Sequence, residues 1–312
     1  MRKRYTLDNG QLVETTQGPL RVDIYAKPDN AERQELVSEL GIDEHAVASA
    51  LDPEEVSRIE LEGDRAFIIW KRPSGLSLEQ RMTFEVRSLG IILERNHLVL
   101  VQADEEVSLE DRTLRACRSL NELLLRLLTG TIHHYLAHLR VIRRVSRELQ
   151  EKLNTSMENT VFLQMLGLSE SLVYYVNALD ANSGVLARMA NMTQKLGFSP
   201  QEVELLEDLT IDNRQCLRQG EIYASILSGL MDARGNIINN NMNVLLKNLT
   251  IINIVFLPLN LIAGMGGMSE YSVWTRSAHW VVSYGLFTVG MVVLGILTWK
   301  LLNRRIERNK PR

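Results

Sequence analysis

The stretch that decides the fold lies near the C-terminus, where residues 249–268 read LTIINIVFLPLNLIAGMGGM and residues 278–299 read AHWVVSYGLFTVGMVVLGILTW. Each stretch is long and apolar enough to cross a bilayer, because about 20 helical residues span its hydrocarbon. A short polar loop, residues 269–277, joins them. The sequence therefore predicts two transmembrane helices that form a hairpin.

Charge is distributed unevenly along the chain. Residues 249–312 contain 7 Lys and Arg against 2 Asp and Glu, whereas the preceding 248 residues contain 28 against 36. The basic tail after Trp299 indicates a cytoplasmic C-terminus, and two spans then place the N-terminus on the same side. The first eight residues have basic side chains but no apolar core, so they do not predict a signal peptide. An acidic domain of net charge −8 favours cations over nucleic acid as partners.

Ahead of the hairpin, the pattern predicts a mixed α/β region followed by long helices. Alternation in Arg21–Tyr25 predicts a strand, and apolar runs on either side of short turns predict further paired strands. The segment Arg72–Leu78 is expected to be an exposed loop. Helices are expected from Leu109 to about Leu153 and from about Met157 to Lys195. Ser199 and Glu202 form a capping box around Pro200, which predicts a new helix that continues without interruption to Gly264. The expected strands are Arg21–Tyr25, Arg58–Leu61, Ala66–Lys71, Met82–Leu93 and His97–Val101.

The resulting fold class is an α+β membrane protein. Its cytoplasmic α/β domain leads into a long stalk helix, which continues as the first transmembrane helix. The expected segments are 1–199, a cytoplasmic α/β and helical domain; 200–248, the cytoplasmic part of the stalk helix; 249–268, the first transmembrane helix; 269–277, a periplasmic loop; 278–299, the second transmembrane helix; and 300–312, a basic cytoplasmic tail.

Polar residues recur along the stalk and first span at alternating intervals of four and three. The series contains eight residues, of which five carry a side-chain amide or hydroxyl. A polar group in hydrocarbon must face protein or water. Hydrogen bonds between helices are the alternative explanation. Because two spans cannot enclose a channel, a polar path requires several copies around an axis, and hence a cyclic homo-oligomer. We call these residues the amide stripe: Asn239, Asn243, Leu246, Thr250, Asn253, Leu257, Asn260 and Gly264.

The chemistry of the stripe favours a hydrated cation. It has no carboxylate, His or Cys, so it lacks the ligands that hold zinc directly. Amide oxygens accept hydrogen bonds from the water that Mg²⁺ retains. Leu246 and Leu257 are expected to form apolar gates. At the outer mouth, the backbone carbonyls of Gly264, Gly266 and Gly267 are expected to be free. Glu270, just beyond them, is expected to concentrate cations.

The run Lys247–Ile252, then Phe256–Gly264, then Gly267 and Met268, resembles the CorA-type family of divalent-cation transporters. The resemblance extends upstream through Ser228–Asp232. It implies a homopentamer in the bacterial inner membrane, a pore-lining first span and a peripheral second span. By position it also implies pore-lining roles for Asn243, Leu246, Leu249, Asn253, Leu257 and Asn260.

The same resemblance places an inner acidic ring at Asp232 and half of a regulatory cation site at Asp208. The usual partner acid of that site corresponds to Ser49, so Asp52, Glu54 and Glu55 become neighbouring candidates. The family signature Gly-Met-Asn is replaced here by Gly267-Met268-Ser269, which changes the outer filter. A branch similar to CmaX fits this departure.

The sequence therefore predicts a channel or transporter for Mg²⁺ or a transition ion such as Zn²⁺, Co²⁺ or Ni²⁺. Its predicted partners are the bilayer, its own copies and divalent cations, the last as substrate and possible regulator. No permanently bound cofactor and no enzyme motif are expected, since no P-loop, dinucleotide turn or nucleophile motif occurs. The alternative is a membrane-tethered sensor or scaffold. His134 and His138 are four residues apart, which is the spacing of a zinc pair on a helix, whereas His133 does not fit that spacing. Metal binding and packing between helices are both open for these three histidines.

Overall fold

The computed structural model describes residues 1–8, 10–15, 18–77, 83–104, 117–155, 159–269, 273 and 279–308. The chain divides into two compact units, Met1–Met231 and Asp232–Arg312. Helix α5 (Pro200–Gly266) contributes to both units, and we describe each unit by itself.

A mixed seven-stranded sheet lies at the centre of the N-terminal unit. Its order is β2-β1-β3-β7-β6-β5-β4, in which only β3 and β7 pair in parallel. The parallel pair joins two antiparallel meanders into one sheet. The strands are β1 (Arg2–Asp8), β2 (Gln11–Glu14), β3 (Arg21–Ala26), β4 (Arg58–Glu62), β5 (Arg65–Ser77), β6 (Thr83–Leu93) and β7 (His97–Gln102).

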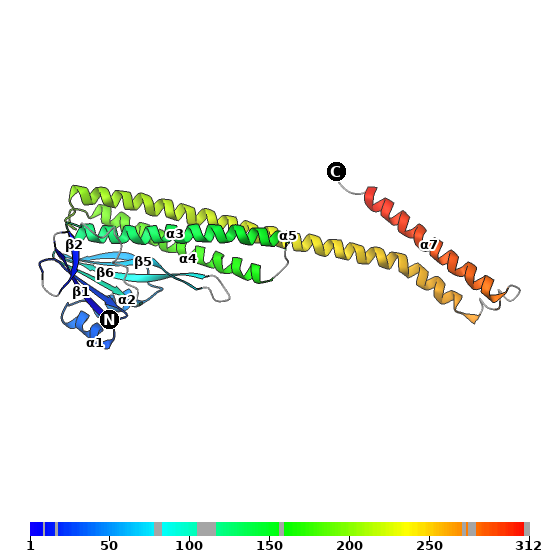
Figure 1. Ribbon diagram of the computed structural model, residues 1–312, viewed down its shortest axis with the longest axis horizontal. Helices are drawn as coiled ribbons and strands as arrows, with labels where there is room; N and C mark the ends of the chain where they lie inside the picture. Colours follow the sequence, from blue (N-terminus) through cyan, green and yellow to red (C-terminus); the bar gives the residue numbers. More distant parts are fainter. Residues whose placement is uncertain are drawn as a thin grey trace. The chain divides into compact units, whose positions relative to one another are not determined.

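Helices cover both faces of this sheet (Figure 1). Helices α1 (Asn30–Ser38) and α2 (Glu44–Leu51) pack on one face, where Ile69 belongs to the smaller core. Helices α3 (Leu120–Thr155) and α4 (Asn159–Asn191) pack on the other face, where Trp70 belongs to the larger core. The first part of α5 adds residues to the same core. Successive residues of β5 thus serve opposite cores, as the period of two in a strand requires.

The start of α5 follows the predicted capping box. The Ser199 hydroxyl accepts the Glu202 N–H at 3.3 Å, and the Glu202 carboxylate accepts the Ser199 N–H at 2.7 Å. Gly197 precedes them with φ of +68°, a conformation that favours glycine and ends the preceding turn. The predicted uninterrupted helix from Pro200 is confirmed, and it continues through Gly266 with Pro258 inside it.

Three expectations about the N-terminal unit need correction. Strands β1 and β2 were not predicted, because their charged residues obscure the alternation. The segment expected to be an exposed loop is largely strand β5, in which Pro73 and Ser74 are buried. The first described long helix begins at Leu120 rather than Leu109, with the Ser119 hydroxyl accepting the Glu122 N–H at 3.0 Å. The predicted start near Leu109 lies outside the described residues.

The C-terminal unit consists of the remainder of α5 and helix α7 (Trp280–Arg308). Two helices are long and apolar enough to cross a membrane: Pro200–Met265 through its apolar part, and Trp280–Leu301. Their apolar windows are not buried inside the protein, which distinguishes them from the core helices of a soluble domain.

Candidate functional site

The apolar part of α5 has one partly buried face. Its less exposed residues recur at helical spacing, and those of α7 do the same. The two helices touch at Gly295, where an added Cβ would lie 3.4 Å from Leu259 Cδ1. The partly buried residues are Ile251, Val255, Pro258, Leu259 and Ile262 on α5, and Ser283, Phe287, Met291, Gly295 and Thr298 on α7.

The amide stripe lies on the other side of α5. All eight of its residues are exposed in the single chain. At about 100° per residue, the centre of the stripe lies roughly 150° from the centre of the partly buried face. Leu249 is also exposed but lies about 70° from the centre of the stripe. The polar side chains therefore do not serve the contact between α5 and α7.

The polar groups of the stripe have oxygen atoms available to a ligand. The structure gives no hydrogen bond to the side chains of Asn253 and Asn260 among the residues that it describes. The Thr250 hydroxyl donates to the Leu246 carbonyl at 2.7 Å, so its proton is engaged and its lone pairs remain as acceptors. A surface of unengaged acceptors suits water molecules held on a cation.

At the end of α5, the backbone carbonyls are less free than expected for the outer mouth. The Gly267 N–H donates to Ala263 O at 3.1 Å and to Gly264 O at 3.3 Å. The Gly264 carbonyl thus accepts a bond within the chain and is not fully free. Met268 and Ser269 are exposed, whereas Glu270 and nearly all of the 269–277 loop lie outside the described residues.

The two predicted cytoplasmic acids are both exposed. Asp232 is the first residue of the C-terminal unit, and Asp208 lies on α5 in the N-terminal unit. Ser49, at the position of the expected partner acid, is buried and accepts a hydrogen bond from Arg58 Nη2 at 3.2 Å. Arg58 also pairs with Glu55 at 2.5 Å. Arg58 and Glu55, which pair with each other, therefore both lie beside Ser49.

The three histidines do not assemble a metal site. The rings of His134 and His138 are 4.3 Å apart, and His138 Nδ1 lies 2.5 Å from the Tyr175 hydroxyl. His133 approaches Asp212 at 3.8 Å. Within the described ranges, no group of three or more His, Cys, Asp or Glu side chains could hold a metal ion.

The packing of His138 makes the N-terminal unit sensitive to acid. Burial, and then the charge of His134, lower the pKa of His138 from 6.5 to about 4. Protons therefore bind the unfolded chain first, and stability should fall as pH falls from about 6.5 towards 4. Thermal unfolding at pH 7 and pH 5 should show a smaller acid shift for His138→Gln than for the wild type. Equal shifts would contradict this assignment.

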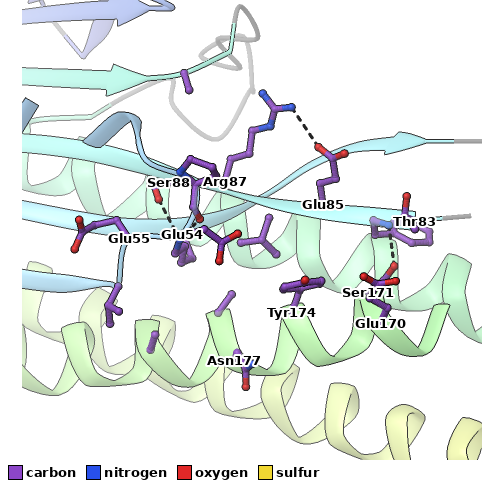
Figure 2. Close-up of a pocket in the computed structure, with 18 of the residues that line it drawn as sticks. Glu54, Glu55, Thr83, Glu85, Arg87, Ser88, Glu170, Ser171, Tyr174 and Asn177 are labelled. Atoms are coloured by element: carbon purple, nitrogen blue, oxygen red, sulfur yellow. Dashed lines mark hydrogen bonds and ion pairs between the residues drawn. The ribbon is translucent and has the colours of Figure 1, made fainter. Parts of the chain in front are cut away.

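A cleft of about 760 Å³ lies on the flank of α4 (Figure 2). Its walls are α4 and the segment between α2 and β4, and its floor is formed by the neighbouring parts of β5 and β6. Lys71 on the floor is 8% exposed, and its ammonium donates to Pro53 O at 2.5 Å and Ser88 Oγ at 3.1 Å. Burial lowers the pKa of Lys71. Sequence patterns contain no signal for this cleft, because its walls are far apart in the chain.

These elements define a membrane protein with two candidate transmembrane helices and one α/β domain. The first of the two apolar segments is the continuation of a long helix that begins in the α/β unit. The sequence model of the family described as "CorA-like Mg2+ transporter protein" matches residues 24–304, and this chain belongs to that family. The family assignment inferred from the hairpin is thus confirmed, as is the prediction of a metal-ion transport protein with transmembrane helices.

Individual relatives agree with this assignment. The cobalt/magnesium transport protein CorA of Methanocaldococcus jannaschii is 27% identical over 257 residues, which cover 80% of this chain and 79% of the relative. The complete structure of the CorA magnesium transporter from the same organism has a TM-score of 0.79 at 23% identity, covering 97% and 98% of the two chains. The structure of full-length CmaX has a TM-score of 0.71 at 15% identity, covering 97% and 96%. These two structural likenesses establish the fold.

Proposed function

We propose that this protein conducts hydrated divalent cations along a path lined by the amide stripe of α5. The observation that carries the proposal is the position of the stripe, roughly 150° from the face of α5 that contacts α7. Unengaged amides on that face are costly in hydrocarbon, so they need water or copies of themselves.

The proposed assembly is a cyclic homo-oligomer, with five copies as the family resemblance implies. Copies arranged around one axis would bring Asn253 and Asn260 to the same water-filled centre. Leu246 and Leu257 would form the narrow apolar rings that close the path by dewetting. The second span would then lie at the periphery, in contact with lipid.

The proposed topology places both termini and the α/β domain in the cytoplasm of a bacterial inner membrane. Its basis is charge: α7 ends in a basic segment that includes Lys300 and Arg304. The proposed inner acidic ring is Asp232. Regulation by cytoplasmic cations would use Asp208 with a carboxylate from another copy, since Arg58 occupies the surroundings of Ser49 in its own chain.

The ion is proposed to be Mg²⁺ or a transition ion, because the relative named above is described as a cobalt/magnesium transport protein. Purified protein in liposomes loaded with ion-sensitive dyes should show uptake of at least one of Mg²⁺, Zn²⁺, Co²⁺ and Ni²⁺ above empty liposomes. A parallel series with an imposed pH gradient tests proton coupling.

A second candidate is a membrane-tethered cation sensor or scaffold that has lost transport. The feature that favours it is Ser269, which follows Gly267 and Met268 where the family signature has asparagine. A hydroxyl replaces an amide carbonyl at the outer filter. Flux that equals empty liposomes for all four ions, from protein shown to be folded and oligomeric, would favour this candidate over the channel.

A further inference from the structure

One face of α3 carries an unusual concentration of positive charge. Arg140, Arg143, Arg144 and Arg147 are spaced i, i+3, i+4 and i+7, which places them on one side of a helix. All four are exposed, and the structure gives their side chains no ion pair or hydrogen bond among the residues that it describes. We call these four residues the arginine face. Four guanidiniums without an ion pair on one helix face are suited to an acidic partner.

The cleft on α4 has the complementary charge. Glu85 in this cleft pairs with Arg87 at 3.2 Å. Glu54 and Glu170 are exposed and have no ion pair with any residue that the structure describes. Figure 2 shows these two carboxylates coming from different walls, with Tyr174 on the α4 wall. Tyr174 is 49% exposed and offers the kind of aromatic ring on which a guanidinium stacks.

The arginine face cannot reach this cleft within one copy. Helix α4 uses Tyr175 to contact α3, since its ring lies 4.9 Å from that of Tyr135. The cleft residues Glu170, Tyr174 and Asn177 leave α4 on another side, roughly 120° away at about 100° per residue. The two charged surfaces therefore lie on different flanks of the same helical layer.

The two surfaces have the same height along α5. His133 on α3 and Leu179 on α4 mark a common level, because they contact the adjacent α5 residues Asp212 (3.8 Å) and Asn213 (3.0 Å). Helix α3 runs parallel to α5 and α4 antiparallel to it (Figure 1). Arg143 is ten residues beyond His133 and Glu170 is nine before Leu179, so both lie about 14–15 Å further along α5.

We propose that the arginine face of one copy docks into the acidic cleft of the next copy around the ring. This inference rests on the cyclic assembly of the proposed function. Rotation about an axis parallel to this part of α5 preserves height, so only surfaces at equal height can meet. A contact between two different surfaces is heterologous, and it closes into a ring when the rotation is suitable. The guanidiniums of Arg143 and Arg144 then lie at the height of Glu170 and pair with it, one of them stacks on Tyr174, and Glu54 adds to the negative charge of the cleft.

Cross-linking tests the contact directly. Full-length protein carrying Arg144→Cys and Glu170→Cys together is treated with a short bis-maleimide. The native thiols Cys117 and Cys216 are buried and provide a low background. A ladder of covalent species up to the full ring is expected from the double variant, and none from either single variant. Cross-linked dimers from a single variant would indicate an isologous contact and overturn the proposal.

Charge reversal provides an independent test. Arg143→Glu with Arg144→Glu, or Glu54→Arg with Glu170→Arg, should each increase the concentration at which rings dissociate, by about tenfold or more. All four changes together should restore the wild-type value, whereas Arg188→Glu should leave it unchanged. Unchanged dissociation in both reversed proteins, or no restoration in the combined one, would overturn the contact.

Native mass spectrometry separates this proposal from the proposed function. If the charge-reversed proteins form rings as stable as the wild type and still conduct ions, the docking contact is wrong and the proposed function stands. If the wild-type protein is monomeric in lipid nanodiscs, both the docking contact and the shared pore are wrong.

Discussion

Replacing Asn253 or Asn260 with leucine is expected to lower divalent-cation flux by more than about tenfold. Each replacement removes an acceptor for water held on the cation, and a charge-assisted hydrogen bond contributes roughly 1.5–3 kcal/mol. Because 1.4 kcal/mol corresponds to about tenfold in rate and a ring repeats the loss in every copy, the effect should be large. Leucine has the same branching at Cγ and the same number of side-chain heavy atoms as asparagine, and the replaced side chains are exposed in the single chain, so the helix should persist. Dye-based flux into liposomes measures the outcome.

Asn248→Leu is the matched control for this pair. Asn248 carries the same amide on the same helix, and it lies roughly 170° from the centre of the stripe. Its replacement should leave flux within about twofold of the wild type, since it would not face the proposed path. If Asn253→Leu and Asn260→Leu form normal oligomers and conduct like Asn248→Leu, the stripe does not line the path.

Replacing Asn182 with leucine is expected to destabilise the N-terminal unit by roughly 3–5 kcal/mol. Strand β4 pairs with β5 only as far as Arg58 and Ile69, so the edge of β5 beyond Ile69 is unpaired on that side. The Asn182 amide takes the place of the missing strand. It accepts the Lys71 N–H at 3.0 Å and donates to the Lys71 carbonyl at 2.8 Å.

Asn182 is fully buried, and its oxygen also accepts the Ser57 hydroxyl at 2.9 Å. Leucine would leave three buried polar groups without partners, each costing about 1–3 kcal/mol. Such a loss is a large share of the stability of a typical domain. Chemical unfolding followed by circular dichroism provides the measurement, with Asn177→Leu as an exposed control on the same helix. Equal midpoints for Asn182→Leu and the wild type would show that these bonds contribute nothing.

Local patterns predicted much of this fold correctly. The capping box at Ser199 and Glu202 located the start of α5 because both partners lie within one helical turn. The short apolar run in His97–Val101 predicted β7, and this strand is buried on both faces: Leu98 and Leu100 belong to the larger core, and Val99 and Val101 to the smaller one. The 3.6-residue period likewise placed all eight stripe residues on one face of a helix, and they are exposed together in the structure.

Predictions that required distant partners were the weaker ones. Pro73 and Ser74 resemble loop residues, yet they are buried in β5 because β6 and the helical layer cover them. Ser49 could be aligned with a metal-binding position, but only the structure places Arg58 against it. No sequence pattern indicated Asn182, because its partners Lys71 and Ser57 are more than 100 residues away.

The sequence alone determined the two apolar helices, the capped start of α5 and the amide stripe, because helical periodicity and transfer out of water act on neighbouring residues. Tertiary structure alone decided which face of α5 contacts α7, how Asn182 completes the edge of β5, and that the acidic cleft and the arginine face share a height. These features depend on how elements separated by many residues pack together, and local physical preferences do not encode that packing.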